Sequence, residues 1–195
     1  MNEQIPVHDG DALLVVDVQN DFLTGGSLAV PGGEEVIPPL SRCIDIFQQH
    51  GQPIYATRDW HPEHHCSFRE HGGSWPAHCV AGTAGADFAP GLGLPAFSMF
   101  VSKATAPDQD THSSFEGTPL HGQLMMYGVK RLFIGGLSVD DCVLNTVRDA
   151  LKLGYQVFLL SDAVRAVNVN PGDEERAIAA MIALGAHSIA SADLI

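Results

Sequence analysis

The sequence predicts a doubly wound α/β fold, in which helices cover both faces of a mainly parallel sheet. Short runs rich in apolar and β-branched residues alternate with longer segments of helical period, as in βαβ units. Several runs, such as LLVVDV at 13–18 and LFIGGL at 132–137, are apolar almost throughout, which is typical of strands buried on both faces. The chain has 195 residues, of which 45% are hydrophobic, enough for one sizeable core. We therefore expect a single domain over 1–195.

The expected elements follow from these periods. The predicted strands are 12–18, 53–57, 99–102, 131–137, 156–160 and 187–190. The predicted helices are 34–50, 120–127, 139–153 and 173–184. The helix over 139–153 has the clearest ends, because Ser138 stands where an N-cap belongs, Asp141 falls in the first turn and Gly154 suits a left-handed stop.

Charge and hydropathy exclude several classes of partner. Asp and Glu total 23 against 10 Lys and Arg, a formal net charge of −13 at pH 7. A surface with this charge repels nucleic-acid phosphates and anionic lipid heads, so we expect no nucleic acid and no membrane as partners. No apolar run approaches the roughly 20 residues of a membrane span, and the first residues do not resemble a secretory signal. The expected compartment is the cytoplasm.

Chemistry-bearing residues follow the predicted strands. In an open parallel sheet ligands bind beyond the carboxyl ends of the strands, and these positions hold Asp17, Asp59 with His61, Lys103 and the segment 138–142. After Asp59 comes a long stretch without periodicity and rich in Gly, Pro, His and Ala. Such loops are generally functional in compact domains. We predict a metal-binding loop region at about 59–97.

Five of the ten histidines lie within this region (His61, His64, His65, His71 and His78). In an extended segment Asp59 and His61 point to the same side, so both can ligate one ion. Imidazole nitrogen and carboxylate oxygen are ligands of zinc, iron, manganese or nickel. We choose His65 and His78 to complete the set, although spacing alone does not decide between His64, His65 and His71. The alternative is a solvated, histidine-rich loop.

A nucleophile is the second hypothesis. Cys142 falls in the first turn of the predicted helix, where backbone N–H groups stabilise a thiolate, although a buried cysteine without chemistry is the commoner case. Lys103 and Asp17 end otherwise apolar strands, and there they either form a structural salt bridge or activate the thiol. Phe22 and Trp75 either line an aromatic slot for a flat ring or pack in the core.

These residues belong to longer motifs, and the motifs resemble the nicotinamidases of the isochorismatase-like cysteine hydrolases over almost the whole chain. The matching segments are V-V-D-V-Q-N-D-F (15–22), T-R-D-W-H (57–61), H-C-S-F (65–68), W-P-x-H-C-V-x-G-T (75–83) and G-L-S-V-D-D-C-V (136–143). The D-x-H pair followed by W-P-x-H-C is specific to the metal-containing branch of the superfamily. The resemblance implies an isochorismatase-like hydrolase fold.

Residue by residue, the resemblance assigns roles. It implies that Asp17 is the general base, Lys103 the charged group that orients it, and Cys142 the nucleophile. It also implies a cis peptide before Ser138, with the backbone N–H groups of Ser138 and Cys142 forming the oxyanion hole. It further implies that Phe22 and Trp75 bind the substrate ring. The implied metal ligands are Asp59, His61 and His78, with His65 as a fourth ligand in some members. The implied cofactor is one divalent ion, with zinc as the leading candidate and iron or manganese as alternatives.

The implied activity is hydrolysis of nicotinamide to nicotinate and ammonia through a cysteine thioester, with pyrazinamide as a second substrate and a place in NAD salvage. Homo-oligomers are common in this superfamily. The chain departs from the family pattern at Val139, Ala104 and Asp141, where a bulkier residue often precedes the cysteine. Two alternatives are a hydrolase of another small amide or carbamoyl compound, and a non-enzymatic redox-sensing thiol protein.

Overall fold

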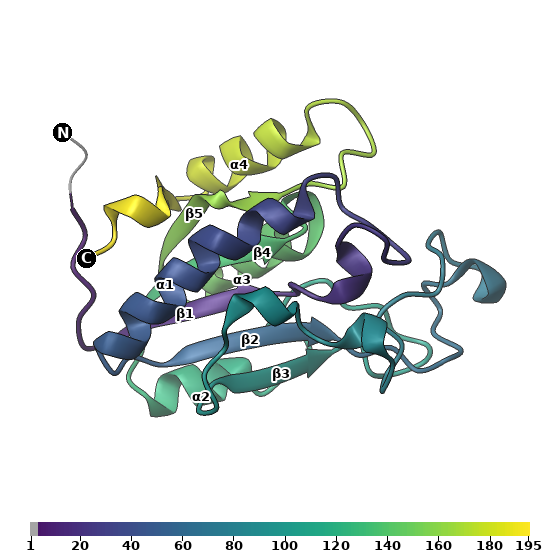
Figure 1. The fold of residues 1–195 in the computed structure, drawn as a ribbon, viewed down its shortest axis with the longest axis horizontal. Helices are drawn as coiled ribbons and strands as arrows, with labels where there is room; N and C mark the ends of the chain where they lie inside the picture. The colour runs from purple at the N-terminus through teal and green to yellow at the C-terminus, as the bar shows by residue number, and fades with distance from the viewer. Residues whose placement is uncertain (1–3) are drawn as a thin grey trace.

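A computed structural model describes residues 4–195 of the chain (Figure 1). Its centre is a six-stranded sheet in the order β3-β2-β1-β4-β5-β6, in which every neighbouring pair is parallel. This arrangement confirms the predicted doubly wound fold. The strands are β1 (Asp11–Val16), β2 (Ile54–Asp59), β3 (Met99–Lys103), β4 (Arg131–Leu137), β5 (Gln156–Arg165) and β6 (His187–Ile189).

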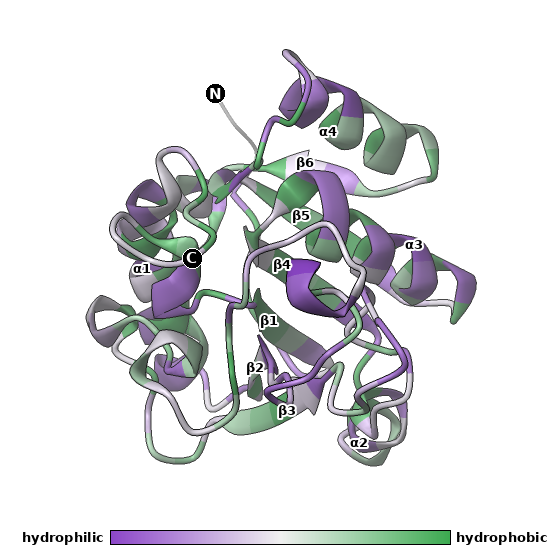
Figure 2. Ribbon diagram, turned by 90° about the vertical axis from the view of Figure 1, so that its right-hand side faces the viewer, coloured by the Kyte–Doolittle hydropathy of each residue, from purple (hydrophilic) through white to green (hydrophobic). Residues whose placement is uncertain are grey.

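Helices cover both faces of the sheet. They are α1 (Ile37–Gln49), α2 (Leu120–Met126), α3 (Leu144–Lys152) and α4 (Asp173–Ala183). One core cluster packs Leu40 and Phe47 of α1 with Leu13 of β1, and the other packs Leu124 of α2 and residues of α3 and α4 with Leu14. Successive residues of β1 thus face opposite layers, which explains why the strand is apolar throughout. Figure 2 shows the hydrophobic strands enclosed between these helices.

The ends of several elements differ from the prediction. Residues Gly33–Val36 form a 3₁₀ turn and α1 begins only at Ile37. Proline has no N–H and fits the first turn of a helix, so Pro38 marks the start of α1. The strand β5 extends five residues beyond the expected end at 160, past a register shift between Ile134 and Gly136 of β4.

The predicted helix over 139–153 is two elements. Val139–Val143 form a π-helical turn, and the regular helix α3 follows it. The prediction of a side-chain N-cap at Ser138 is wrong, since its side chain makes no capping hydrogen bond; instead its carbonyl oxygen accepts the N–H of Val143 at 3.0 Å. Gly154 does adopt the expected left-handed conformation, with φ +90°.

The order of the strands places a crevice between β1 and β4. Connections from β1 and from β4 lead to opposite sides of the sheet, and ligands bind at such a switch point. The two strands approach so closely there that a Cβ atom on Gly136, whose φ is +135°, would lie 2.0 Å from the carbonyl oxygen of Val16. Asp17 and the π-helical turn that holds Cys142 follow these two strands directly.

The long segment between β2 and β3 is ordered without regular elements. It contains three 3₁₀ turns, Arg69–His71, Ala84–Ala86 and Pro90–Leu92. Isolated β-bridges join His61 to Val80 and Phe68 to Trp75, so the loop folds back on itself beside the ends of β1 and β2. The predicted metal-binding region is therefore a structured loop next to the crevice.

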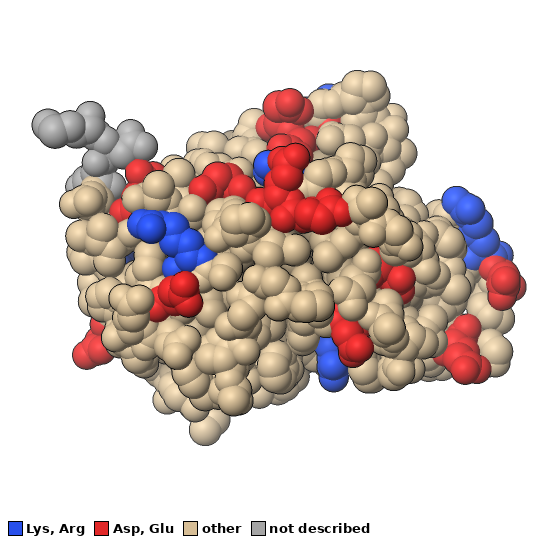
Figure 3. Space-filling model, in the orientation of Figure 1, with Lys and Arg blue, Asp and Glu red and all other residues tan. Residues whose placement is uncertain are grey.

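Acidic side chains outnumber basic ones on the face of the molecule shown in Figure 3, in keeping with the formal net charge of −13. Across residues 4–195, no helix combines the length and the apolar character that crossing a membrane requires.

Candidate active site

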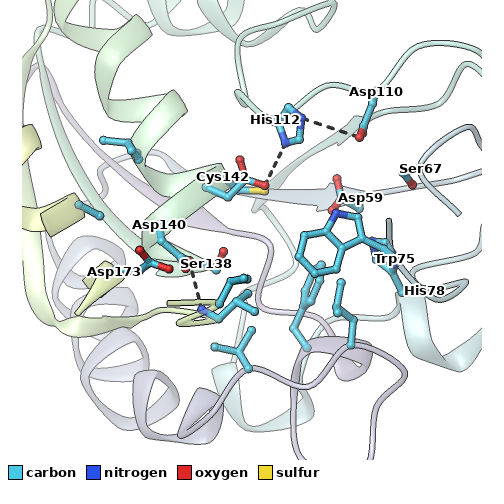
Figure 4. A pocket seen from close by; sticks show the side chains of 18 of the residues that line it. Asp59, Ser67, Trp75, His78, Asp110, His112, Ser138, Asp140, Cys142 and Asp173 are labelled. Atoms are coloured by element: carbon cyan, nitrogen blue, oxygen red, sulfur yellow. Dashed lines mark hydrogen bonds and ion pairs between the residues drawn. The ribbon is translucent and has the colours of Figure 1, made fainter. Parts of the chain in front are cut away.

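A cavity of about 420 Å³ opens at the carboxyl ends of β1, β2 and β4. Cys142 and Ser138 line one side of it, and Asp59, His78 and Trp75 line the other (Figure 4). The size is within the usual range for a small-molecule site. The thiol and the histidine cluster that the sequence singled out therefore share one cavity.

The buried ammonium of Lys103, at the end of β3, contacts reactive groups at or beyond the ends of β1, β2 and β4. Its Nζ lies 3.0 Å from Asp17 Oδ2, donates to Asp59 Oδ1 and is 3.5 Å from Cys142 Sγ. Thr57 Oγ1 donates to Asp17 Oδ1 at 2.7 Å, which fixes the carboxylate and leaves Oδ2 without a well-aligned donor among the described residues. One oxygen of the Asp17 carboxylate lies within 4.8 Å of Cys142 Sγ, so this carboxylate is an available proton acceptor close to the thiol.

Burial and charge set the protonation states of this group. Burial raises the pKa of Asp17 to about 6, although the Lys103 ammonium opposes the rise. Burial also raises the pKa of the Cys142 thiol well above its ordinary value, again against Lys103. For Asp59, burial alone would raise the pKa, but the Lys103 ammonium together with His61 and His78 outweighs it and holds the pKa of that carboxyl below its usual range. The buried surroundings of Cys142 therefore favour the protonated thiol, which needs a base before it can attack.

Asp59, His61 and His78 form a cluster that fits a metal ion. All three are buried, and one ligand atom of each lies within 4.8 Å of the others. The Nδ1 atoms of His61 and His78 face carbonyl oxygens at 3.2 and 2.8 Å, which leaves each Nε2 lone pair free for an ion. Burial lowers the pKa of His61 to about 4, so its ring is neutral, as ligation requires.

The other histidines of the region do not join this cluster. The His65 ring stacks on His61 with centroids 4.1 Å apart, but its Nδ1 lies 2.7 Å from Ser67 Oγ and its Nε2 lies 3.2 Å from the Gln109 carbonyl oxygen. His64 and His71 pack against each other at the exposed surface of the loop. The role of His65 as a fourth ligand stays a prediction.

The expected aromatic residues line the cavity, and the expected cis peptide precedes Ser138, which also lines it. Phe22 and Trp75 both line it, and the Phe22 ring lies 5.7 Å from that of His78. The peptide bond between Leu137 and Ser138 is cis, as the resemblance implied. Because Ser138 precedes the π-helical turn, its backbone N–H and that of Cys142 come from the same short segment beside the thiol.

Two positioning residues in the segment 19–21 were missed by the sequence analysis. Gln19 is buried and exchanges two hydrogen bonds of 2.8 Å with the backbone of Asp59. Asp21 accepts the N–H of Cys79, next to His78, at 2.7 Å. The only available signal was their place in the motif V-D-V-Q-N-D-F, since neither side chain lines the cavity.

A nucleophilic sulfur, a carboxylate able to take its proton and an ammonium between them are the groups needed to attack an amide carbonyl. Set at the switch point of a doubly wound sheet, they define an α/β cysteine hydrolase. The chain belongs to the isochorismatase family, because the family described as "Isochorismatase domain" matches residues 11–193.

Named relatives agree with this assignment. A pyrazinamidase of Pyrococcus horikoshii, solved in complex with zinc, is 48% identical with a TM-score of 0.89, covering 93% of this chain and 99% of that one. The PnC1 protein of L. infantum, solved with nicotinate, is 35% identical with a TM-score of 0.89, covering 98% and 99%. The nicotinamidase of Escherichia coli K12 is 38% identical over 203 residues, covering 93% of this chain and 95% of the relative.

Proposed function

We propose that this protein hydrolyses nicotinamide to nicotinate and ammonia, and also accepts pyrazinamide. The observation that carries the proposal is the single cavity lined by both the Cys142 thiol and the Asp59–His61–His78 cluster. If the ring nitrogen of the substrate lies at the Asp59–His61–His78 wall, the carboxamide on the ring points toward Cys142. Relatives named as nicotinamidase and pyrazinamidase support this substrate class.

In the first half of the reaction, Asp17 Oδ2 removes the thiol proton of Cys142. The sulfur then attacks the amide carbon, while the Lys103 ammonium stabilises the negative charge on sulfur from 3.5 Å. The backbone N–H groups of Ser138 and Cys142 receive the oxyanion. Asp17 returns its proton to the nitrogen, the C–N bond breaks, and ammonia leaves a thioester on Cys142.

In the second half, water takes the place of ammonia. Asp17 removes a proton from the water as its oxygen attacks the thioester carbon, and the same N–H groups receive the oxyanion. The C–S bond then breaks, the proton held by Asp17 returns to the sulfur, and the product leaves as nicotinic acid, which gives its remaining proton to ammonia or water and becomes nicotinate. Asp17 gives up each proton that it accepts, so the reaction ends with Cys142 protonated and Asp17 ionised, as it began.

Asp59, His61 and His78 would hold one divalent ion, for which the nitrogen and oxygen donor set favours zinc, with iron or manganese as alternatives. Such an ion supplies a positive charge for the lone pair of the ring nitrogen, directly or through water. Phe22 and Trp75 would contact the two faces of the ring and exclude water from it. Ring orientation thus depends on the loop, and bond cleavage on the strand ends.

An ammonia-release assay on nicotinamide, pyrazinamide and an aliphatic amide tests the proposal. We expect release from both aryl amides, little from the aliphatic amide, loss on chelation and recovery with added zinc. Cys142→Ala should abolish release, whereas Cys66→Ala, at a half-buried cysteine outside the cavity lining, should not. Equal turnover of the aliphatic amide would favour a different small-amide hydrolase, and no release by metal-loaded protein would contradict the proposal.

A further inference from the structure

The residue before the nucleophile carries a negative charge. Asp141 precedes Cys142 in the π-helical turn, and both line the cavity. Burial chiefly raises the pKa of the Cys142 thiol, and the Asp17, Asp59 and Asp141 carboxylates, in that order, add to the rise. An uncompensated charge at this position therefore opposes both the thiolate and the oxyanion that the reaction forms.

A histidine lies against this carboxylate. His112, which also lines the cavity, places its Nδ1 2.9 Å from Asp141 Oδ2, and its Nε2 is 3.8 Å from Asp110 Oδ2 (Figure 4). Because a carboxylate faces each ring nitrogen, the geometry favours the imidazolium, in which both nitrogens carry a proton. Asn145 Nδ2 donates to the other Asp141 oxygen at 3.1 Å, so both carboxylate oxygens are engaged.

The backbone on both sides of His112 is fixed by buried hydrogen bonds. On one side Thr111 Oγ1 accepts the N–H of Ala104, directly after β3, at 2.8 Å. On the other side the N–H of Ser114 donates to Thr146 Oγ1 of α3 at 2.9 Å. The imidazole is thus held between the end of β3 and the helix that follows the nucleophile, and its contact with Asp141 does not depend on a mobile loop.

We propose that His112 is a positioning residue, which holds and neutralises the Asp141 carboxylate so that its charge does not oppose the nucleophile Cys142. The proposal rests on the proposed function only in taking Cys142 as the nucleophile. Both partners are partly exposed, with 44% of the His112 and 39% of the Asp141 side chain accessible, so water and salt screen the pair. The effect on rate should accordingly be modest, about three- to tenfold at low ionic strength.

The pair also predicts a pH dependence. The hydrogen bond with Asp141 raises the pKa of His112 above 6.5, Asp110 acts in the same direction, and burial and the Lys103 ammonium oppose it. His112 is charged below this pKa and loses its charge as the pH rises through it. The kcat/KM of the wild-type protein for nicotinamide should therefore exceed that of His112→Gln most at about pH 6, and the difference should vanish at about pH 9.

A double-mutant cycle separates this role from a structural one. His112→Gln should lower kcat/KM for nicotinamide about three- to tenfold, and Asp141→Asn should leave it unchanged or raise it. In the double variant the loss should disappear, because the charge that His112 neutralises is gone. His112→Lys should keep more activity than His112→Gln, and His50→Gln, at the far end of α1, is the matched control.

Alkylation of Cys142 by iodoacetamide gives a readout that needs no turnover. In a Cys66→Ser background, His112→Gln should slow alkylation at about pH 6 and the double variant should restore it. This pattern without ammonia release would retain the inference and overturn the proposed function. Equal alkylation rates for wild type and His112→Gln, or losses that add in the double variant, would overturn the inference.

Discussion

Gln19 and Asp59 form a two-way hydrogen-bonded pair across the ends of β1 and β2. Gln19 Nε2 donates to the carbonyl oxygen of Asp59 at 2.8 Å, and the N–H of Asp59 donates to Gln19 Oε1 at 2.8 Å. The same Nε2 also donates to the carbonyl oxygen of Ala86 in the long loop at 2.9 Å. One buried amide therefore fixes the backbone of a proposed metal ligand and attaches the loop to the sheet.

Replacing this amide should weaken both the fold and the metal site. In Gln19→Leu three buried backbone groups lose their partners, so we expect the free energy of unfolding to fall by about 2–4 kcal/mol. We expect zinc affinity to fall at least about tenfold, because Asp59 loses its backbone support. Urea unfolding and zinc titration measure the two effects. Gln48→Leu, at an exposed position of α1, is the matched control, and equal behaviour of the two variants would contradict the role of Gln19.

A glycine in the long loop lies against the carboxylate that supports His78. A Cβ atom on Gly85 would lie 2.2 Å from Asp21 Oδ2, the atom that accepts the N–H of Cys79. Gly85→Ala should therefore displace this contact and lower the free energy of unfolding by about 1–3 kcal/mol. Gly122→Ala in α2 meets nothing within 4 Å and should be neutral or stabilising. If Gly85→Ala were as stable as Gly122→Ala, that result would contradict the close packing of this loop against Asp21.

Metal content distinguishes the ligands from their neighbour. We expect His78→Ala to lose the bound ion and the activity together. His65→Ala should keep about one ion per chain with weaker binding, because both ring nitrogens of His65 face other partners. Inductively coupled plasma mass spectrometry of freshly purified variants measures this. An empty site in His65→Ala would establish His65 as a direct ligand.

Substrate affinity should depend on the aromatic wall of the cavity. Trp75→Ala removes a ring face at which a planar substrate is desolvated, so KM for nicotinamide should rise about tenfold. The value of kcat should change less, because Trp75 does not touch the bond that breaks. Phe97→Ala, at an exposed aromatic outside the cavity lining, is the control. A fall in kcat at constant KM would instead place Trp75 close to the reacting carboxamide.

Residue types alone predicted the sheet, because a strand buried between two helical layers must be apolar on both sides. The four residues from Leu13 to Val16 meet this condition fully, and the ends of β4 were predicted to the residue. Element boundaries that depend on the backbone were not predictable. The π-helical turn before α3 depends on the bond from Val143 to Ser138, for which the sequence carries no mark.

The chemistry of the site was accessible where reactive groups interrupt apolar segments, as Asp17 and Lys103 do. Spacing could not decide between His64, His65 and His71, because the loop that holds them folds back through isolated bridges. His112 was missed for a similar reason. It lies in a segment without periodicity, and only the tertiary contacts of Thr111 and Ser114 bring it to Asp141.

The central claim is that Cys142 carries the acyl group of nicotinamide during the reaction. Rapid acid quenching of the metal-loaded protein with nicotinamide, followed by peptide mass spectrometry, measures it most directly. The account predicts a peptide containing Cys142 that is heavier by one nicotinoyl group, and its absence in Cys142→Ala. Steady ammonia release by Cys142→Ala, or an acyl group on another residue, would contradict the account.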